Sequence, residues 1–534
     1  MRQCATMSQD DSGYGSGEQL SSDADGRPDG ETDQFDIERR DYMKGVAAAA
    51  AAGGLGAAAT GTASAETADT SKTVDERIQE HRTGGLEVVV EDSDGNAVSD
   101  ADVSITQQDH DFGFGTAVNA DTLINQSSAG DNYREYIPEL FNKAVIENQM
   151  KWRFWENDQQ LADDAVNWLL DQGLDVRGHV CIWGDESTGS IPSDIQTAID
   201  NRDAQTIRDR SMQHIEDIIT HYGDDITEWE VVNEAMHKLD LHVGVYGDQI
   251  DQEEPWTGEV VPWTSQLLAD WYDKAESVID SNGLDCGVAV NDFNQFAYSY
   301  TDGRYQTEIE HINQNAVQLD TIGLQAHVGA RTGEYNTNSS PDGRISAGQV
   351  ADEINKWADY GASVKITEFD TYNGNDWNSD QERADTLESY LRGAFSHPGV
   401  DDFLLWGFWD GRHWRDEAPL FYQDWSQKPG YDVWTTLVYD QWWTDESGTT
   451  DSSGTYTTTA FLGDHEVTID GSTTTTVSVD SASGTTTVTV TVDGSGSGGG
   501  DSEAPTAPSD LTVSATTSSS VSVDWSASSD SGSG

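Results

Sequence analysis

The segment Trp229-Glu230-Val231-Val232-Asn233-Glu234-Ala235-Met236 decides how the rest of the chain is interpreted. Residues 229–232 have the pattern of a buried strand end, because an apolar β-branched pair follows a polar, turn-rich segment and the periodicity then stops. Asn233 and Glu234 therefore lie where this strand ends. In parallel α/β proteins, ligands and catalytic groups gather at the carboxyl ends of strands. The pair therefore indicates either a chemical site or a polar helix start.

A second carboxylate at a strand end favours the chemical site. Val364-Lys365-Ile366-Thr367-Glu368-Phe369-Asp370 is another short β-branched run, and Glu368 follows Glu234 by 368 − 234 = 134 residues. Two glutamates at two strand ends can face each other across a barrel mouth, as double-displacement glycoside hydrolysis requires. One carboxyl group must be protonated to help the leaving oxygen depart, and the other must stay ionised to attack the anomeric carbon.

Strand-like runs alternate with helical patterns throughout the central part of the chain. This alternation predicts βα units that close a parallel sheet. We therefore expect an α/β fold, a (β/α)8 TIM barrel with a small N-terminal β lead-in and C-terminal all-β appendages, whose active face is formed by the strand ends. The eight expected strands lie at 112–118, 144–147, 176–180, 226–232, 286–291, 321–326, 364–367 and 403–406.

Several motifs at these strand ends resemble glycoside hydrolase family 10, the retaining endo-β-1,4-xylanases. The two segments quoted above match its W-x-V-V-N-E and I-T-E-x-D motifs, residues 147–152 match E-N-x-M-K-W, and residues 323–327 match G-L-Q-x-H. The similarity covers roughly residues 108 to 443. It implies the TIM barrel fold, Glu234 as the acid/base and Glu368 as the nucleophile.

The resemblance also implies the residues that bind the sugar. Lys151 would serve the sugar beside the scissile bond, Glu147 and Asn148 would hold the next sugar, and Asn233 would hydrogen-bond the 2-hydroxyl group. His327 would hydrogen-bond Glu368 and help to keep it ionised. The complete expected set is catalytic Glu234 and Glu368, with substrate-binding Glu147, Asn148, Lys151, His179, Trp183, Asn233, Gln325, His327, Trp406 and Trp414.

Some positions depart from the family pattern, and others could have a structural role instead of a functional one. Gly184 stands where a second histidine is common, and Glu186 stands where a glutamine often contacts the next sugar, so contacts at that sugar should differ. Asn291-Asp292-Phe293-Asn294 resembles the family's N-D-x-N and is expected to support the structure. Trp409 is equally well read as a core residue. The chemistry needs no metal or organic cofactor, and retention predicts a carboxyl separation of about 5 to 5.5 Å.

The charge of the chain is extreme. It carries 28 Lys and Arg residues against 97 Asp and Glu residues, a formal net charge of −69. Such a surface would repel a phosphate backbone, so nucleic acid is not an expected partner. So dense a charge is tolerable chiefly where salt shortens the Debye length to about 3 Å, as at 1 M. We therefore expect a halophilic protein.

The N-terminal region has the features of an export signal. Residues 1–65 combine a polar, acidic leader, expected to be disordered, with Arg39-Arg40, an alanine run and an Ala-x-Ala site, as in twin-arginine signals. An alanine-rich helix on a basic cap is the alternative. Glycines interrupt this short apolar segment, so no membrane span is expected. Cys4 would be lost with the signal, and Cys181 and Cys286 are expected to be buried thiols rather than a disulfide.

The rest of the chain is expected to flank the barrel with small β elements. An N-terminal hairpin should turn at Asp94-Gly95-Asn96. The C-terminal module could bind sugar or act as a spacer. The expected boundaries are 66–107 for the N-terminal β element, 108–443 for the barrel, 444–454 for a linker, 455–493 for a small β-module, 494–503 for a Gly/Ser linker and 504–534 for an incomplete fibronectin type III-like segment.

Taken together, the sequence predicts a secreted, extracellular, monomeric endo-β-1,4-xylanase whose partner is xylan. A related barrel β-glucanase or cellulase would share the glutamate pair, and activity on carboxymethyl-cellulose would distinguish it. A non-catalytic polysaccharide-binding barrel is the alternative outside enzymes. Such a protein would be expected to lose one carboxylate, and both are present here.

Overall fold

The computed structural model describes residues 66–296, 299–329, 344–372 and 377–492, together with two strands near the C-terminus. The predicted leader, the twin-arginine signal and the Gly/Ser linker lie outside the described residues. Within the predicted fibronectin-like segment, β17 (Thr512–Thr516) and β18 (Val521–Asp524) form an antiparallel pair. Among the described helices, none is long and apolar enough to cross a membrane.

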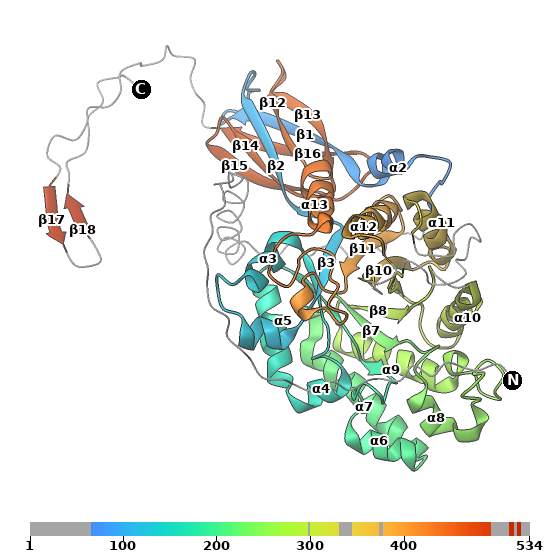
Figure 1. The fold of residues 1–534 in the computed structure, drawn as a ribbon. Helices are drawn as coiled ribbons and strands as arrows, with labels where there is room; N and C mark the ends of the chain where they lie inside the picture. Colours follow the sequence, from blue (N-terminus) through green and yellow to red (C-terminus); the bar gives the residue numbers. More distant parts are fainter. Residues whose placement is uncertain are drawn as a thin grey trace, which may run out of the picture. The chain divides into compact units, whose positions relative to one another are not determined.

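The predicted eight-stranded parallel barrel is confirmed (Figure 1). Its strands pair in the order β5-β4-β3-β11-β10-β9-β8-β7, and a β5–β7 pairing closes the ring. A short extra strand, β6 (Ile182–Trp183), pairs with β7. The strands are β3 (Gly113–Val118), β4 (Lys143–Ile146), β5 (Asp175–Gly178), β7 (Glu228–Asn233), β8 (Gly287–Asp292), β9 (Thr321–Leu324), β10 (Ser363–Phe369) and β11 (Val400–Leu405).

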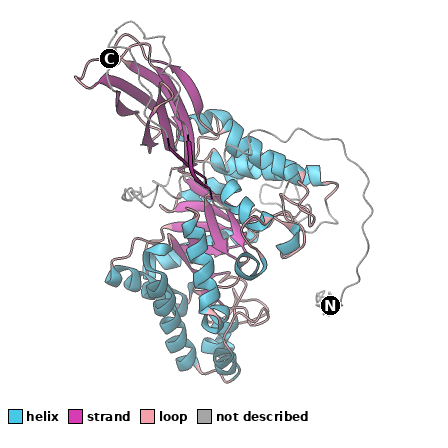
Figure 2. Ribbon diagram, turned by 90° about the vertical axis from the view of Figure 1, so that its left-hand side faces the viewer, coloured by secondary structure: helices cyan, strands magenta, loops and turns pink. Residues whose placement is uncertain are grey.

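Helices follow the strands in sequence and surround the barrel (Figure 2). Their apolar sides pack on the sheet, and large side chains such as Trp271 and Trp357 are fully buried there. Side-chain caps start several of them, including the Ser346–Gln349 capping box. The helices are α3 (Asn132–Leu140), α4 (Trp152–Asn157), α5 (Gln159–Asp171), α6 (Ser193–Asp200), α7 (Ala204–Tyr222), α8 (Asp240–Tyr246), α9 (Gln266–Asn282), α10 (Ser299–Asn315), α11 (Ala347–Ala358), α12 (Asp380–Phe395) and α13 (Pro429–Thr435).

The predicted N-terminal element and C-terminal module form a single β-sandwich. One sheet has the order β13-β1-β16 and the other β12-β2-β14-β15, and their inner faces share one apolar core that includes Val88, Ile105 and Val467. The barrel is therefore inserted between two parts of this sandwich. The strands are β1 (Thr83–Asp92), β2 (Asp102–His110), β12 (Asp445–Thr449), β13 (Thr455–Phe461), β14 (Gly463–Ile469), β15 (Thr473–Val479) and β16 (Thr485–Val492).

The sandwich corrects three predictions. The boundaries that separated 66–107 from 455–493 are wrong, and much of the predicted linker 444–454 is strand β12. The predicted turn does form: Glu91 and Ala97 make an antiparallel bridge, and Val98 N–H donates to Val90 O at 2.9 Å. The pairing does not continue, because β1 and β2 enter different sheets. Alternating apolar residues show which face of a strand is buried, but they do not show which strand lies beside it.

Arg82 anchors the sandwich to the barrel. It lies between α2 (Val74–His81) and β1, and its buried guanidinium group donates to the carbonyl oxygens of Phe395, His397 and Val400 at 2.8, 2.7 and 2.5 Å. Burial lowers the pKa of Arg82 to about 10, although nearby acids oppose this shift. Of the two described cysteines, Cys181 is buried, Cys286 is half-buried and both are free.

Candidate active site

Glu234 follows β7 directly, in a backbone conformation that is uncommon for a residue with a side chain. Its φ is 59°, in the left-handed region where non-glycine residues are rare and often functional. Neighbouring backbone stabilises the turn, because Glu234 N–H donates to Asn291 O at 2.9 Å and Glu234 O accepts from His237 N–H at 2.9 Å. The strand end is thereby fixed and the carboxyl group is held in place.

The side chain of Glu234 lies in an environment that favours its protonated form. Trp183 Nε1 donates to Oε2 at 3.0 Å and Gln325 Nε2 donates to Oε1 at 3.1 Å. The residue is 9% exposed. Burial raises the pKa of Glu234, and the charges of Asp292 and Glu368 raise it further. A carboxyl group of this kind can act as a general acid near neutral pH.

Glu368, on β10, has different partners. Asn291 Nδ2 donates to its Oε1 at 2.8 Å, and His327 Nε2 lies 3.2 Å from its Oε2. The other ring nitrogen of His327, Nδ1, lies 3.0 Å from a carboxylate oxygen of Asp370. Burial alone would lower the pKa of His327, but the charge of Asp370 and contacts to both carboxylates raise it to about 10. A cationic imidazole therefore lies beside Glu368.

Amide side chains connect the two glutamates. Gln325 Nε2 donates both to Glu234 and, at 3.0 Å, to Asn233 Oδ1. Asn291 Nδ2, which holds Glu368, lies 3.5 Å from the same Asn233 oxygen. The end of β7 therefore shares one hydrogen-bond network with the ends of β8, β9 and β10. This network fixes the two carboxyl groups relative to each other.

A buried ionic chain supports this network from within the barrel. His179 Nδ1 lies 3.1 Å from Glu230 Oε2, and Arg177 Nη1 donates to the same oxygen at 2.6 Å. Burial would raise the pKa of Glu230, but His179 and Arg177 outweigh it and lower the pKa to about 2. Arg177 also donates to Glu228 at 2.6 Å. These pairs keep buried charges neutralised below the site.

One trio near the site could in principle ligate a metal. His179, Glu230 and Glu368 each place a donor atom within 4.8 Å of the others. Each of these groups already has protein partners, since Arg177 and His179 hold Glu230 and Asn291 holds Glu368. The arrangement is accounted for as a hydrogen-bonded acid network.

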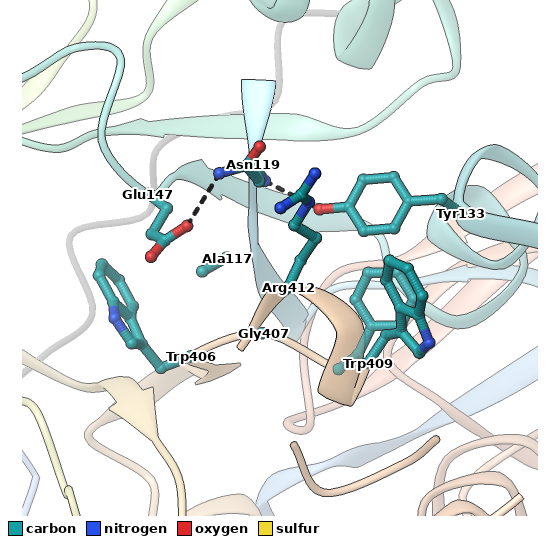
Figure 3. Close-up of a pocket in the computed structure, with 9 residues that line it drawn as sticks. Ala117, Asn119, Tyr133, Glu147, Trp406, Gly407, Trp409 and Arg412 are labelled. Carbon is teal, nitrogen blue, oxygen red and sulfur yellow. Dashed lines mark hydrogen bonds between the residues drawn. The ribbon is translucent and has the colours of Figure 1, made fainter. Parts of the chain in front are cut away.

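The expected sugar-binding residues lie beside this centre. Lys151 Nζ donates to Asn148 Oδ1 at 2.9 Å and lies 4.4 Å from the centre of the Trp183 ring. Burial lowers the pKa of Lys151. Asn119 Nδ2 donates to Glu147 at 3.3 Å, and Glu147 lines a pocket with Trp406 (Figure 3). The ends of β3 and β4 therefore contribute polar groups to one side of the site.

Two tryptophans after β11 extend the site. Trp406 packs edge-on against His179, with ring centres 5.1 Å apart, and is nearly buried. Trp414 is 43% exposed and its Nε1 donates to Asp370 Oδ2 at 2.6 Å. Trp409 is half-buried: it stacks on Trp425 at 4.3 Å and also lines the pocket of Figure 3. It therefore combines core packing with a place at the pocket wall.

The structure assigns contacts to several residues that sequence reasoning left without a role. Asn291, expected only to support the structure, donates directly to Glu368. Asp292 is fully buried and lies 2.7 Å from His237 Nδ1. Asp370 holds both His327 and Trp414. The signal available in the sequence was position, since each carboxylate lies at or next to the carboxyl end of a barrel strand.

The departure at Gly184 has a steric explanation. A Cβ atom at this residue would lie 2.8 Å from the carbonyl oxygen of Lys238. Gly184 O also accepts from Asp240 N–H at 3.2 Å, and Asp240 Oδ2 accepts from Glu186 N–H at 2.7 Å. The segment after β7 therefore occupies the space that a side chain at residue 184 would need.

Comparisons with known proteins identify the family of this chain. The model of glycosyl hydrolase family 10 matches residues 104–436. The anti-sigma-I factor RsgI6 of Acetivibrio thermocellus is 25% identical over 412 residues, covering 74% of this chain and 46% of that protein. Endo-1,4-beta-xylanase 1 of Arabidopsis thaliana is 23% identical over 389 residues, covering 70% of this chain and 35% of that protein. The chain thus spans less than half the length of these two relatives.

Other relatives are matched over more of their length. The beta-1,4-xylanase of Dictyoglomus thermophilum is 24% identical over 337 residues, covering 58% of this chain and 84% of that protein. The crystal structure of native xylanase 10B from Thermotoga maritima is 19% identical with a TM-score of 0.47, covering 62% of this chain and 96% of that chain. Because the family model matches more than half of its residues, the chain belongs to glycosyl hydrolase family 10.

Proposed function

We propose that this protein is a retaining endo-β-1,4-xylanase that hydrolyses internal bonds of xylan by double displacement. The observation that carries the proposal is the contrast between two glutamates in one amide network. Glu234 is held by neutral donors and its pKa is raised by burial, whereas Glu368 lies beside a cationic imidazole. The names of the similar xylanases support xylan as the substrate.

In the first step Glu368 attacks the anomeric carbon of the sugar in the cleavage subsite. Glu234 gives its proton to the glycosidic oxygen as the C–O bond breaks, so the leaving chain departs as a neutral alcohol. A covalent glycosyl-enzyme ester forms on Glu368. Asn233, next to Glu234 in the chain, is placed to hydrogen-bond the 2-hydroxyl group, a contact that strengthens in the oxocarbenium-like transition state.

In the second step water releases the sugar. Glu234, now a carboxylate, takes a proton from the water as its oxygen attacks the anomeric carbon and the ester bond to Glu368 breaks. Two inversions give net retention of configuration. The protein's own carboxyl groups supply all the proton transfers, so the steps consume only water.

Two variants and one spectrum test the mechanism. Glu368→Ala should abolish reducing-sugar release from xylan, and Glu234→Ala should slow it. On an aryl xylobioside whose phenolate leaves without protonation, added azide should restore turnover of Glu234→Ala as a β-glycosyl azide, because the small anion needs no general base. Proton NMR of early wild-type products should show the β-anomer first. An α-anomer appearing first would refute retention, and full activity of Glu368→Ala would refute the assignment of the nucleophile.

The substrate has a specific competitor. A β-glucanase of the same fold would share the glutamate pair, so initial rates on linear xylan and on carboxymethyl-cellulose should be compared with the same enzyme preparation. The proposal requires the xylan rate to exceed the cellulose rate clearly. Equal hydrolysis rates on the two polymers would favour the β-glucanase. No hydrolysis of either polymer would favour the non-catalytic barrel.

We also propose that the enzyme is a secreted, halophilic monomer exported by the twin-arginine route. The paired arginines Arg39-Arg40 and the net charge of −69 support this setting. A polymer such as xylan is too large to import, so export suits its hydrolysis. Replacing both arginines by lysine should keep the protein inside cells of a twin-arginine host, whereas unchanged secretion would refute the route.

A further inference from the structure

Arg412 stands at a pocket next to the proposed cleavage site. The pocket is lined by polar and aromatic groups from the ends of β3, β4 and β11, among them Asn119, Tyr133, Glu147, Trp406, Trp409 and Arg412. Figure 3 shows Glu147 and Trp406 on one side of it and Arg412, Tyr133 and Trp409 on the other. Because Trp406 packs on His179 of the catalytic network, the pocket continues directly from that network.

The guanidinium group of Arg412 is unusual for this chain. Acids outnumber bases by 97 to 28, yet Arg412 forms no salt bridge with a described carboxylate. Its side chain donates to the amide oxygen of Gln126, which leaves most of its five N–H donors free, and the residue is exposed. Carboxylates hold many of the other described arginines: Arg177, Arg202, Arg208, Arg210, Arg344, Arg383 and Arg392.

The loop that carries Arg412 is held firmly. Asp410 Oδ1 accepts from Ala418 N–H and from Lys428 Nζ, both at 2.7 Å. At Gly411 an added Cβ would lie 2.2 Å from the Trp409 ring, so the indole packs directly over the backbone. Arg412 N–H donates to Trp409 O at 3.1 Å. The guanidinium group is therefore carried by a fixed turn, as a recognition residue requires.

The neighbours of Arg412 suit an acidic sugar. Tyr133 is buried, and its hydroxyl oxygen accepts from Asn119 N–H at 2.8 Å, so its own proton remains to be donated to a ligand. The Trp409 indole, stacked on Trp425, forms an apolar wall on this side of the pocket. A guanidinium fork matches a carboxylate in bidentate geometry, and this contact is stronger than one with a neutral hydroxyl group.

We propose that this pocket binds a uronic acid side chain of xylan, with Arg412 pairing with its carboxylate. The inference rests on the proposed xylanase function. Glu147 is expected to hold the sugar next to the one in the cleavage subsite, so the acidic substituent would be carried on that sugar or on the one beyond it. A protein of charge −69 repels acidic polymers at long range, but salt screens that repulsion and leaves the short-range contact to decide.

The test compares two polymers that differ only in charge. Initial rates on glucuronoxylan and on the same glucuronoxylan with its carboxyl groups reduced to alcohols should be measured in one buffer and salt, for the full-length wild type, Arg412→Ala and Arg412→Lys. Arg202→Ala is the matched control, because Arg202 is an exposed arginine paired with Asp248. Linear xylohexaose serves as the uncharged reference.

The wild type should prefer the acidic polymer over the reduced one. Arg412→Ala should lose about tenfold in kcat/KM on glucuronoxylan, equivalent to about 1.4 kcal/mol, while its kcat/KM on xylohexaose and on the reduced polymer stays within about twofold. Arg412→Lys should recover part of the preference, because it keeps the charge but not the fork. Mass spectra of the final acidic products should show longer unsubstituted stretches between the substituted sugar and the reducing end for Arg412→Ala.

The outcomes separate this inference from the function on which it rests. If Arg412→Ala loses kcat/KM equally on all three substrates, or loses none, the proposed uronate site is wrong. Hydrolysis of xylohexaose by the wild type in that same experiment would leave the xylanase function intact. Absence of wild-type activity on xylohexaose would instead overturn the proposed function itself.

Discussion

His327 places its Nε2 3.2 Å from Oε2 of Glu368, and its pKa is raised to about 10. The imidazole is therefore cationic throughout the neutral range and stabilises Glu368 in the ionised form that a nucleophile needs. His327→Asn keeps a polar group but removes the charge. The acidic limb of kcat/KM should then move to higher pH, because an adjacent opposite charge is lost.

The measurement is the pH dependence of kcat/KM on a soluble xylooligosaccharide. His311→Asn is the control, since His311 bonds Ser265 O on the outer helices. An acidic limb that stays in place in His327→Asn would show that the charge of His327 does not act on Glu368.

The same variant tests how the charge of His327 contributes to the free energy of unfolding. The raised pKa means that this contribution is complete below about pH 6.5 and disappears as pH rises through about 10, so the two proteins should converge in unfolding free energy there.

The basic limb should report Glu234, the proposed general acid. The charge of Asp292 raises the pKa of Glu234 in addition to burial. Asp292→Asn should therefore lower that pKa and move the basic limb of kcat/KM to lower pH. His237, 2.7 Å from Asp292, carries the opposite charge when protonated, so His237→Asn should move the limb the other way or leave it unchanged. Shifts of the same sign in both variants would contradict this account.

Restoring the common family histidine at residue 184 should harm the protein. The Cβ of Gly184→His would lie 2.8 Å from Lys238 O, a backbone atom that can move only with the whole segment after Glu234. We expect a loss of about 1 to 3 kcal/mol in unfolding free energy together with a lower kcat, because that segment carries the acid/base. Chemical denaturation and xylan kinetics check this. A stable variant with tighter substrate binding would show that the site has room for the second histidine.

The sandwich should be one cooperative unit made from both ends of the described chain. Ile469 in β14 is fully buried in the core shared with β1 and β2. Ile469→Ala should cost about 2 to 5 kcal/mol, whereas Thr474→Ala, exposed on β15, should change little. A chain ending at Trp443 should also expose the apolar faces of β1 and β2 and aggregate. If that shortened chain melts like the full protein, the two ends do not share a core.

The barrel was predictable from the sequence because its signals are local. Each strand is a short apolar run followed by a polar group, and β7 and β10 end at Asn233 and Phe369, within two residues of the predicted ends. Parallel neighbours in such a barrel follow chain order, so recognising the strands is almost enough to place them. Gln325 and His327 were expected on one side of a strand, but β9 ends at Leu324 and Ala326 between them has a φ of 58°, so strand alternation does not place them.

The sandwich and the supporting charges were not predictable, because their partners are distant in the chain. Val88 of β1 lies in register with Val488 of β16, and no local pattern specifies a pairing over such a separation. Likewise the sequence pattern places Asp292 in a loop. Its contact with His237, a residue of the preceding βα unit, is visible only in the structure. The sequence identifies which residues carry chemistry more readily than which residues tune it.

Salt dependence should be the clearest physical property of this protein. With a net charge of −69, self-repulsion acts between most pairs of surface carboxylates and is screened only within the Debye length, about 3 Å at 1 M but about 10 Å at 0.1 M. Exposed ion pairs such as Arg202–Asp248 strengthen as salt falls, but solvent keeps each of them weak, so repulsion dominates. Below about 0.5 M salt we expect unfolding or inactivation.

Tryptophan fluorescence and xylan activity across a sodium chloride titration measure this salt dependence, with sucrose of equal osmolality as the control. Lowering the pH toward the carboxylate pKa range removes negative charge and should reduce the salt required, whereas full stability in dilute buffer at neutral pH would contradict the halophilic assignment.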